Sequence, residues 1–426
     1  MNREESHYEV IVIGGGPAGC TAATLLAQKG RRVLLLEKDA MPRYHIGESL
    51  MPFCWFTLEK LGVLEEMKKH EFVQKLSVQF VNSDGKQSRP FYFFQHNDHP
   101  SSYTWQVERS DFDLMLFENA KKQGVDARQL TKVTRVLKAE DGAVTGVVAT
   151  DADGEQREFH APLTIDCSGR DAFWMSKNSW RRRDPLLKKV AIWTYYKGAM
   201  RDEGLAAGST TVAYIPEKGW FWYIPLRDDV VSVGVVAERD YLFREGRDPA
   251  QIMAREAETN AWIKEHLAPG QQFGEYWVTG EYSYRAQYCA ADGLVLAGDA
   301  FVFLDPVFSS GVFLAFKSAE MVAEAVEAAL EKGRYTADQF EAYGAALCDH
   351  VETMRKIVYA FYEEDFSFGK LIKMNPDLRG RLTDCLIGDV SQDFQELFAG
   401  VEQIAGETEP LDYGMKGAPS GELTRA

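Results

Sequence analysis

The sequence predicts an α/β fold, in which a Rossmann-like dinucleotide-binding domain carries an inserted antiparallel β-sheet and is followed by a helical C-terminal region. Three observations predict it. Residues 8–37 have the pattern of a strand, a glycine-rich turn, an Ala/Leu-rich helix and a second strand. Residues 190–282 contain alternating, aromatic-rich segments typical of an antiparallel sheet. From residue 337 to about residue 401 the pattern is helical.

The first turn indicates where a dinucleotide phosphate binds. Its glycines allow a tight bend and a close approach of the backbone, and the N-terminus of the next helix attracts phosphate charge. Glu37 ends the second strand, 18 residues after Gly19, where it can accept a hydrogen bond from a ribose hydroxyl. This fingerprint does not by itself choose between NAD and FAD. The expected contact residues of the turn are Gly14, Gly16, Pro17, Ala18 and Gly19.

Two later segments are expected at the same edge of the sheet. The loop after the second strand contains Arg43, Glu48 and Ser49, and loops that leave this edge surround the ligand. An ordinary surface loop is the alternative. Ser310 and Gly311 begin an Ala-rich helix after another buried strand, so they lie at a helix N-terminus that can bind an anion.

These patterns divide the chain into three parts and a tail. Residues 72–80, which include Lys75, alternate as one strand, and Asp111 is expected as the N-cap of a helix. A helix near residues 249–266 interrupts the inserted sheet. We expect a dinucleotide-binding domain of residues 1–80, 106–188 and 283–334, a sheet domain of residues 81–105 and 189–282, a helical region of residues 335–406 and a flexible tail of residues 407–426.

Composition excludes several classes of function. The net charge of −16 argues against a nucleic-acid or anionic-membrane partner. The first apolar run leads directly into the glycine turn, which argues against a signal peptide, and no apolar run is long enough to span a membrane. The six cysteines lack metal or CxxC spacing and indicate buried thiols of a reduced, cytoplasmic protein. The eight histidines show no HxxxH or HExxH pattern, so no metal is expected.

Several segments together resemble a known family. Residues 14–19 with Glu37, the segment around Arg109, and residues 166–170 and 297–300 are typical of the flavoprotein monooxygenase class. Within that class, Trp-Phe-Trp-Tyr-Ile-Pro at residues 220–225 matches the WxWxIP motif of flavin-dependent halogenases in full. Residues 42–50 and 305–312 are similarly typical of that family. The resemblance implies a Rossmann-like, glutathione-reductase-type FAD-binding domain with a β-sheet substrate domain.

The resemblance also implies a reaction. FADH2 and oxygen form a flavin C4a-hydroperoxide, chloride or bromide attacks it, and the hypohalous acid produced travels to Lys75. An electron-rich phenol, pyrrole or activated acyl group, free or bound to a carrier protein, is then halogenated. Because the chain has no second GxGxxG fingerprint, a separate NAD(P)H flavin reductase is the expected source of reduced flavin.

The same resemblance assigns the site residues. Lys75 is expected to guide the halogen, and Trp220 and Trp222 to shield the flavin and halide from the organic substrate. The spacing of the two tryptophans also fits plain core packing, and a strand lysine can also extend to solvent. The halide ligands are expected to be Ser310 and Gly311. The expected FAD contacts, in addition to the glycine turn, are Glu37, Lys38, Arg43, Ser49, Arg109, Asp299, Pro306, Gly311 and Val312.

The sequence departs from the family in one informative place. Tryptophan halogenases carry a glutamate just before the Ser-Thr-Gly stretch, and this chain has Phe308 there. The departure favours the branch that acts on phenolic, pyrrolic or acyl substrates. An aromatic hydroxylase and a prenyl-chain reductase of the same fold are the alternatives, and the intact WxWxIP motif argues against both.

Overall fold

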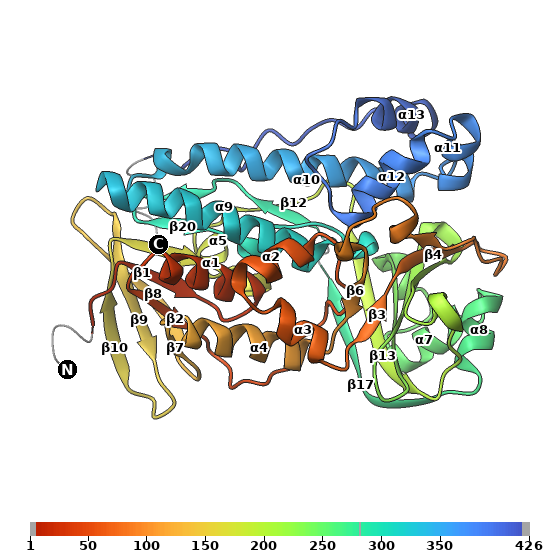
Figure 1. Cartoon of the computed structure of the whole chain (residues 1–426), viewed down its shortest axis with the longest axis horizontal. Helices are drawn as coiled ribbons and strands as arrows, with labels where there is room; N and C mark the ends of the chain where they lie inside the picture. The colour runs from red at the N-terminus through yellow and green to blue at the C-terminus, as the bar shows by residue number, and fades with distance from the viewer. Residues whose placement is uncertain (1–5, 281–282, 420–426) are drawn as a thin grey trace.

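A computed structural model describes residues 6–280 and 283–419 of the chain. Figure 1 shows an elongated molecule with the dinucleotide-binding part at one end and a large sheet at the other. The first part contains a six-stranded sheet in the order β19-β20-β11-β1-β2-β7. The central strand β1 is parallel to β2 and β11, as the βαβ pattern predicts. The strands are β1 Val10–Ile13, β2 Val33–Leu36, β7 Asp126–Arg128, β11 Leu163–Asp166, β19 Ala290–Ala291 and β20 Leu294–Leu296.

Helix α1 (Pro17–Gln28) connects β1 to β2 and is in contact with α4 (Arg109–Lys122) and α9 (Ser310–Lys332). Two glycines make this close packing possible. A Cβ atom at Gly19 would lie 1.8 Å from the Gly14 carbonyl oxygen, and one at Gly14 would lie 2.4 Å from the Cys167 carbonyl oxygen. Gly14 also has a φ of +102°, which favours glycine.

Two smaller sheets flank the dinucleotide-binding part. Strands β8 (Lys132–Lys138), β9 (Val144–Thr150) and β10 (Gln156–His160) form an antiparallel meander. Strand β18 (Tyr284–Ala286) lies between β12 (Arg181–Arg183) and β21 (Val302–Phe303). The remaining helices of this part are α2 Cys54–Leu61, α3 Leu64–Lys69 and α5 Phe173–Lys177.

The large sheet has seven strands in the order β17-β13-β16-β15-β14-β4-β5. Four strands expected from their alternation are present in it. One face of the sheet, which includes Phe221 and Tyr223, packs against short helices, one of which carries Trp262. The opposite face carries Trp220 and Trp222. The strands are β4 Ser77–Val81, β5 Phe91–Tyr92, β13 Lys189–Lys197, β14 Thr210–Tyr214, β15 Trp220–Pro225, β16 Val230–Glu238 and β17 Gln271–Gly280.

Local hydrogen bonding changes three expected elements. The segment expected as one strand at residues 72–80 forms two strands. The first, β3 (Val73–Lys75), pairs with β6 (Thr104–Gln106), whereas β4 joins the large sheet. The domain boundary expected at residue 80 therefore falls inside β4. The helix expected at residues 249–266 is α7 (Pro249–Ala257) and α8 (Ala261–Leu267), because the Asn260 side chain caps α8. Asp111 is not the N-cap of α4, which begins at Arg109 after Glu108. A four-residue helix, α6, covers Arg239–Leu242.

The C-terminal region is helical, as predicted, and α10 (Glu341–Tyr362) runs beside α9 in Figure 1. Helices α11 Phe368–Met374, α12 Leu378–Ile387 and α13 Gln395–Ala405 follow it. The later described part of the tail expected to be flexible is docked on the sheet. Cys289 N donates to Lys416 O (2.9 Å) and Ala418 N donates to Ala290 O (2.8 Å), so the tail extends the edge of the six-stranded sheet. Residues 420–426 lie outside the described residues.

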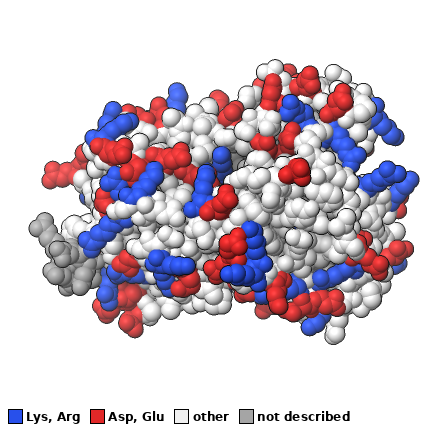
Figure 2. Space-filling model, in the orientation of Figure 1, with Lys and Arg blue, Asp and Glu red and all other residues white. Residues whose placement is uncertain are grey.

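The surface carries charges of both signs. Figure 2 shows Lys and Arg side chains interspersed with Asp and Glu over the face it displays. Among residues 6–280 and 283–419, no helix combines the length and the apolar character that a membrane span needs. The described residues also contain no cluster of three or more His, Cys, Asp or Glu side chains placed to hold a metal ion.

We expect Gly19→Ala to destabilise the protein by about 2 kcal/mol or more, because the added carbon would overlap the Gly14 carbonyl in a packed helix–strand contact. Gly369→Ala is the matched control. Gly369 also lies in a helix, and a Cβ atom added there would stand more than 4 Å from every described atom outside the adjacent turns of that helix. Urea unfolding would measure both changes. Equal effects of the two substitutions would contradict the close packing of α1 on β1.

Candidate active site

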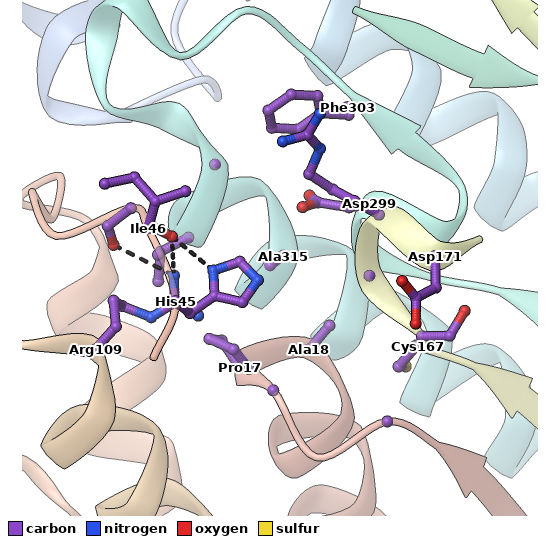
Figure 3. A pocket seen from close by; sticks show the side chains of 18 of the residues that line it. Pro17, Ala18, His45, Ile46, Arg109, Cys167, Asp171, Asp299, Phe303 and Ala315 are labelled. Atoms are coloured by element: carbon purple, nitrogen blue, oxygen red, sulfur yellow. Dashed lines mark hydrogen bonds between the residues drawn. The ribbon is translucent and has the colours of Figure 1, made fainter. Parts of the chain in front are cut away.

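A cavity of about 560 Å³ lies between the dinucleotide-binding part and the large sheet. Its walls come from the first βα turn, the loop of residues 43–49, the start of α9 and strand β15. Figure 3 shows part of it, with Pro17 and Ala18 on one side and Asp299 and Phe303 opposite. Segments expected at one sheet edge from the sequence therefore surround one space.

The glycine turn forms one end of the cavity. Gly14, Gly16, Pro17 and Ala18 line it, whereas Gly19 serves the packing of α1 on β1. A Cβ atom at Gly16 would meet only the Arg43 Nη2 atom, at 3.4 Å, so this position is open toward the cavity. The backbone can therefore approach a pyrophosphate here.

Glu37 and Lys38 follow the turn around the same end. Glu37 is buried, and its Oε2 atom accepts a hydrogen bond from Gly15 N (2.7 Å) while Oε1 accepts from Asp39 N (2.9 Å). Both oxygens are thus held in place beside the cavity, where a carboxylate can meet a ribose hydroxyl. Lys38 also lines the cavity and pairs with Asp171.

A buried carboxylate orients the two arginines of the site. Arg109 donates from Nε and Nη2 to the two oxygens of Asp113 (2.8 and 3.0 Å), and Arg43 Nη1 lies 3.1 Å from Asp113 Oδ2. Burial disfavours the charge on Asp113, but Arg109 outweighs it and holds the pKa of that carboxyl below its usual value. Arg109 Nη1 also donates to Ile46 O (2.7 Å), which fixes the loop over the cavity (Figure 3).

Two neighbouring titratable groups are shifted by burial. Burial, with Arg109 second, lowers the pKa of His45 to about 4, so its ring is neutral at pH 7. Burial raises the pKa of Asp299 to about 6, although Arg170 and Arg109 oppose the shift. Both residues line the cavity. Near pH 7 this part of the site therefore holds two guanidinium groups beside the ionised carboxylates of Asp113 and Asp299, and a neutral His45 ring.

The two motif tryptophans form the wall contributed by the large sheet. Trp220 Nε1 donates to the Tyr362 hydroxyl (2.7 Å), which in turn donates to Asp305 Oδ2 (2.8 Å). Trp222 Nε1 donates to Ser232 Oγ (3.1 Å). Both indoles line the cavity and are almost fully buried. The hydrogen bonds fix both rings, and Asp305 connects this wall to the start of α9.

The segment before α9 completes the opposite wall. Pro306, Gly311 and Val312 line the cavity, as expected, and Ser309 does so as well. Ser309 has a φ of 61°, and this left-handed residue turns the chain into a 23-residue helix. Ser310 is 1% exposed and is not among the lining residues, so only its backbone can contribute to an anion site.

Lys75 lies behind this cavity rather than in its wall. The side chain is 3% exposed, and Nζ donates to Ser49 Oγ (2.8 Å) and to Leu50 O (3.1 Å). Ser49 itself lines the cavity, so one hydroxyl separates the amine from it. Burial lowers the pKa of Lys75 to about 7, because apolar surroundings disfavour its charged form.

Phe308 occupies an apolar environment. Its ring lies 5.7 Å from the ring of Phe361 and 5.9 Å from that of Phe368, centroid to centroid. No carboxylate therefore replaces the family glutamate at this position. The sequence places Glu48 near the cofactor but assigns it no role, and it gives no signal for Tyr44 or Tyr195. The structure brings these three side chains together at the cavity.

Comparisons with known proteins show to which family the chain belongs. A family model described as tryptophan halogenase matches residues 94–375, and one described as FAD-dependent oxidoreductase matches residues 9–174. The chain is 32% identical over 395 residues to a 1H-pyrrole-2-carbonyl-peptidyl-carrier-protein brominase of Pseudoalteromonas luteoviolacea, which covers 90% of this chain and 93% of the relative. It is 34% identical to a tryptophan 2-halogenase of Chondromyces crocatus, covering 84% of this chain and 68% of the relative.

Solved structures give the same result. The flavin-dependent brominase Bmp2 superposes with a TM-score of 0.84 at 29% identity, covering 93% of this chain and 98% of that structure. The myxobacterial chondrochloren halogenase superposes with a TM-score of 0.79 at 31% identity, covering 98% and 95%. The fold and the glycine-turn cavity define an FAD-dependent oxidoreductase. Within that class the chain belongs to the tryptophan halogenase family, and it is a flavin-dependent halogenase.

The open position at Gly16 gives a direct test of the cofactor site. We expect Gly16→Val to purify folded and without FAD, because its φ of −81° suits valine while the side chain would occupy the pyrophosphate space. Flavin absorbance and the thermal midpoint would be measured together. A folded variant with stoichiometric FAD would contradict the placement of the pyrophosphate. Gly14 is less suitable, because a side chain there also strikes the Cys167 carbonyl.

The lowered pKa of Lys75 predicts how stability depends on pH. Between about pH 7 and about pH 10 the unfolded state holds a proton on this amine that the folded state lacks, so the free energy of unfolding rises with pH in that range. Lys75→Met lacks this titration. We therefore expect its stability relative to wild type to be greatest at about pH 7 and to decline toward about pH 10. Parallel pH profiles in urea unfolding would contradict burial of a titrating amine.

Proposed function

We propose that this enzyme halogenates an electron-rich phenol, pyrrole or activated acyl group, either free or bound to a carrier protein, and that Lys75 guides the halogen to it. The relatives support the substrate class, because one of them, by its name, brominates a carrier-bound pyrrole-2-carbonyl group. Phe308 supports it as well, because the position that carries a glutamate in tryptophan halogenases is apolar here.

The observation that carries this proposal is the contact between Lys75 Nζ and Ser49 Oγ. Ser49 lines the flavin cavity, and the amine lies 2.8 Å behind its hydroxyl. With a pKa of about 7, the amine is present in both forms near neutral pH. The neutral form can capture hypohalous acid as a haloamine, and the charged form can donate a hydrogen bond that polarises the halogen.

The flavin cavity supplies the oxidant in this proposal. Bound reduced FAD, with oxygen, provides the oxidising power that converts chloride or bromide to hypohalous acid. The backbone at residues 310 and 311 offers the free N–H groups of a long helix to the halide. Trp220 and Trp222 fill the wall between this point and the large sheet, so they keep a bulky substrate away from the flavin.

Two partners follow from this chemistry. A separate NAD(P)H-dependent flavin reductase supplies FADH2, because the chain has a single dinucleotide fingerprint. A carrier protein presents the substrate if the substrate is carrier-bound, as in the pyrrole brominase and in a pyrrole chlorinase of Pseudomonas fluorescens that is 26% identical to this chain.

We expect Lys75→Met to keep FAD and oxygen consumption and to lose halogenated product by roughly 100-fold or more, because either role of the amine needs its nitrogen. Mass spectra would be recorded for a panel of phenols and pyrroles with reductase, oxygen and either bromide or chloride. Lys75→Arg should rescue poorly, since a guanidinium is wider and is not an amine nucleophile. Lys264→Met, on the outer helix α8, is the control. Product within a few-fold of wild type at equal flavin turnover would remove Lys75 from this role.

A further inference from the structure

A second buried group at the flavin cavity has no role in the mechanism above. Glu48 is 3% exposed and lines the cavity. Its backbone is fixed, because Glu48 O accepts from Val107 N (2.7 Å). Among the described residues, its Oε2 atom is buried and makes no close hydrogen bond, although the Ser232 hydroxyl interacts with the carboxyl group. The carboxyl group therefore keeps unused hydrogen-bonding capacity at the cavity wall, and a buried polar atom without a close partner is costly.

The other oxygen of Glu48 begins a hydrogen-bonded chain toward the surface. Glu48 Oε1 lies 2.5 Å from the Tyr195 hydroxyl, and that hydroxyl lies 3.1 Å from the Tyr44 hydroxyl. Tyr44 is 47% exposed. Trp193 Nε1 donates to the Tyr44 oxygen (2.6 Å), and the ring of Trp277 stacks on Tyr44 with centroids 4.7 Å apart. The hydrogen-bonded chain thus runs from the partly exposed Tyr44 to the Glu48 carboxyl at the cavity wall. Trp193 and Trp277 hold Tyr44, its outer member, in place.

The electrostatic surroundings keep Glu48 able to bind a proton near neutral pH. Burial raises its pKa to about 7; Tyr195, Ser232 and Arg109 oppose the shift, and Glu108 adds to it. Burial also raises the pKa of Tyr195, with Glu48 next in effect, and raises that of Tyr44 to about 12. Both tyrosines therefore keep their O–H groups at working pH. Each can accept one proton while it donates its own, which is what a relay requires.

The reaction of the family class consumes a proton inside the cavity. Oxidation of the halide X⁻ balances as X⁻ + FADH2 + O2 + H⁺ → HOX + FAD + H2O. FADH2 and the halide each give up two electrons, and O2 accepts all four when its O–O bond breaks. One oxygen leaves as HOX and the other as water, and the added proton ends on that water. This proton must come from a donor at the cavity, and transfer from a positioned acid accelerates such a step.

We propose that Glu48, which lies in the wall of the cavity, delivers this proton and is reprotonated from solvent through the hydroxyls of Tyr195 and Tyr44. The transfer leaves Glu48 ionised. Its Oε1 atom then takes the Tyr195 proton, Tyr195 takes that of Tyr44, and water restores the proton of Tyr44, a residue that is 47% exposed. The four other cavity acids do not have this connection. Glu37 is held by backbone N–H groups and Asp171 by Lys38, and among the described residues no tyrosine hydroxyl donates to the side chain of Asp39 or Asp299.

The chain offers a matched pair of tyrosines for the test. Tyr195 and Tyr196 are adjacent on β13, so their side chains point to opposite faces of the sheet, and the Tyr196 hydroxyl interacts with Tyr276 instead. Tyr195→Phe breaks the relay and keeps the ring. Tyr196→Phe makes the same change on the other face, and Glu48→Gln removes the acid while keeping its shape. The thermal midpoint and FAD content of all three would be checked first.

The first measurement needs no turnover. Infrared difference spectra of the FAD-loaded enzyme, recorded from about pH 5 to about pH 9, should show a protonated-carboxyl C=O band that titrates near neutral pH and is absent from Glu48→Gln. In Tyr195→Phe the band should move to higher frequency, because a hydrogen bond to the carboxyl is lost. Tyr196→Phe should leave it unchanged. A wild-type spectrum without this band, or a band insensitive to Tyr195→Phe, would overturn the proposal.

The second measurement is the coupling between oxygen consumption and bromide oxidation. With reduced FAD, oxygen and bromide, hypobromous acid would be trapped by a simple phenol in solution, and hydrogen peroxide would be assayed alongside. We expect both Glu48→Gln and Tyr195→Phe to lower trapped bromine per oxygen consumed by roughly tenfold at about pH 8, with more peroxide released. Unchanged coupling in both variants would also overturn the proposal. The phenol captures hypohalous acid without the help of Lys75. This measurement therefore still tests the role of Glu48 if the proposed role of Lys75 or the proposed substrate class is wrong.

Discussion

The buried hydroxyl of Ser49 holds three parts of the molecule together. Its oxygen accepts from Lys75 Nζ at the end of β3 and lies 2.8 Å from Thr210 Oγ1 at the start of β14. Gln106 Nε2 donates to the same threonine oxygen (2.9 Å), and Ser49 and Gln106 form an isolated β-bridge. The loop over the flavin cavity, the short β3–β6 pair and the large sheet therefore meet at one set of polar side chains. Because these atoms are buried, each one needs the others as hydrogen-bond partners.

This junction separates the flavin cavity from the buried Lys75 amine, the two places to which the proposed function assigns chemistry. The flavin cavity lies on one side of Ser49 and the Lys75 amine on the other. The walls of the cavity are fixed by further buried hydrogen bonds, from Asp113 to both arginines and from Asp305 through Tyr362 to Trp220. A fixed wall that excludes a bulky substrate but ends at a small hydroxyl suits an oxidant the size of hypohalous acid.

Much of this arrangement could be predicted from the sequence. The βαβ unit, four strands of the large sheet and the position of most predicted site residues at the cavity follow from glycine positions, two-residue alternation and family motifs, because each of these signals is local. The role of Gly19 in helix packing is of the same kind, and its Cβ position confirms it. The family and the enzyme class, inferred from WxWxIP and the flanking motifs, are confirmed by the comparisons.

The features that could not be predicted from the sequence depend on contacts between segments that are distant in the chain. The break between β3 and β4 at Leu76 arises because the two strands pair with different partners, and alternation alone does not reveal a change of partner. The docking of the tail depends on free carbonyl and N–H groups at the edge strand β19. The Tyr44–Tyr195–Glu48 chain joins residues about 150 positions apart, and no spacing rule connects them. The position of Lys75 behind Ser49, rather than in an open chamber, is likewise a product of packing.

The central claim is that Lys75 is a buried amine that shares its proton with solvent near neutral pH. The most direct measurement is its pKa in the FAD-loaded enzyme, by NMR of isotope-labelled lysine side chains, with Lys75→Met used to assign the signal. The account predicts a midpoint near pH 7, because burial lowers the pKa of Lys75 to about that value. A midpoint near the ordinary lysine value, above about pH 10, would contradict it, since the amine would then be charged and in contact with water throughout the working range.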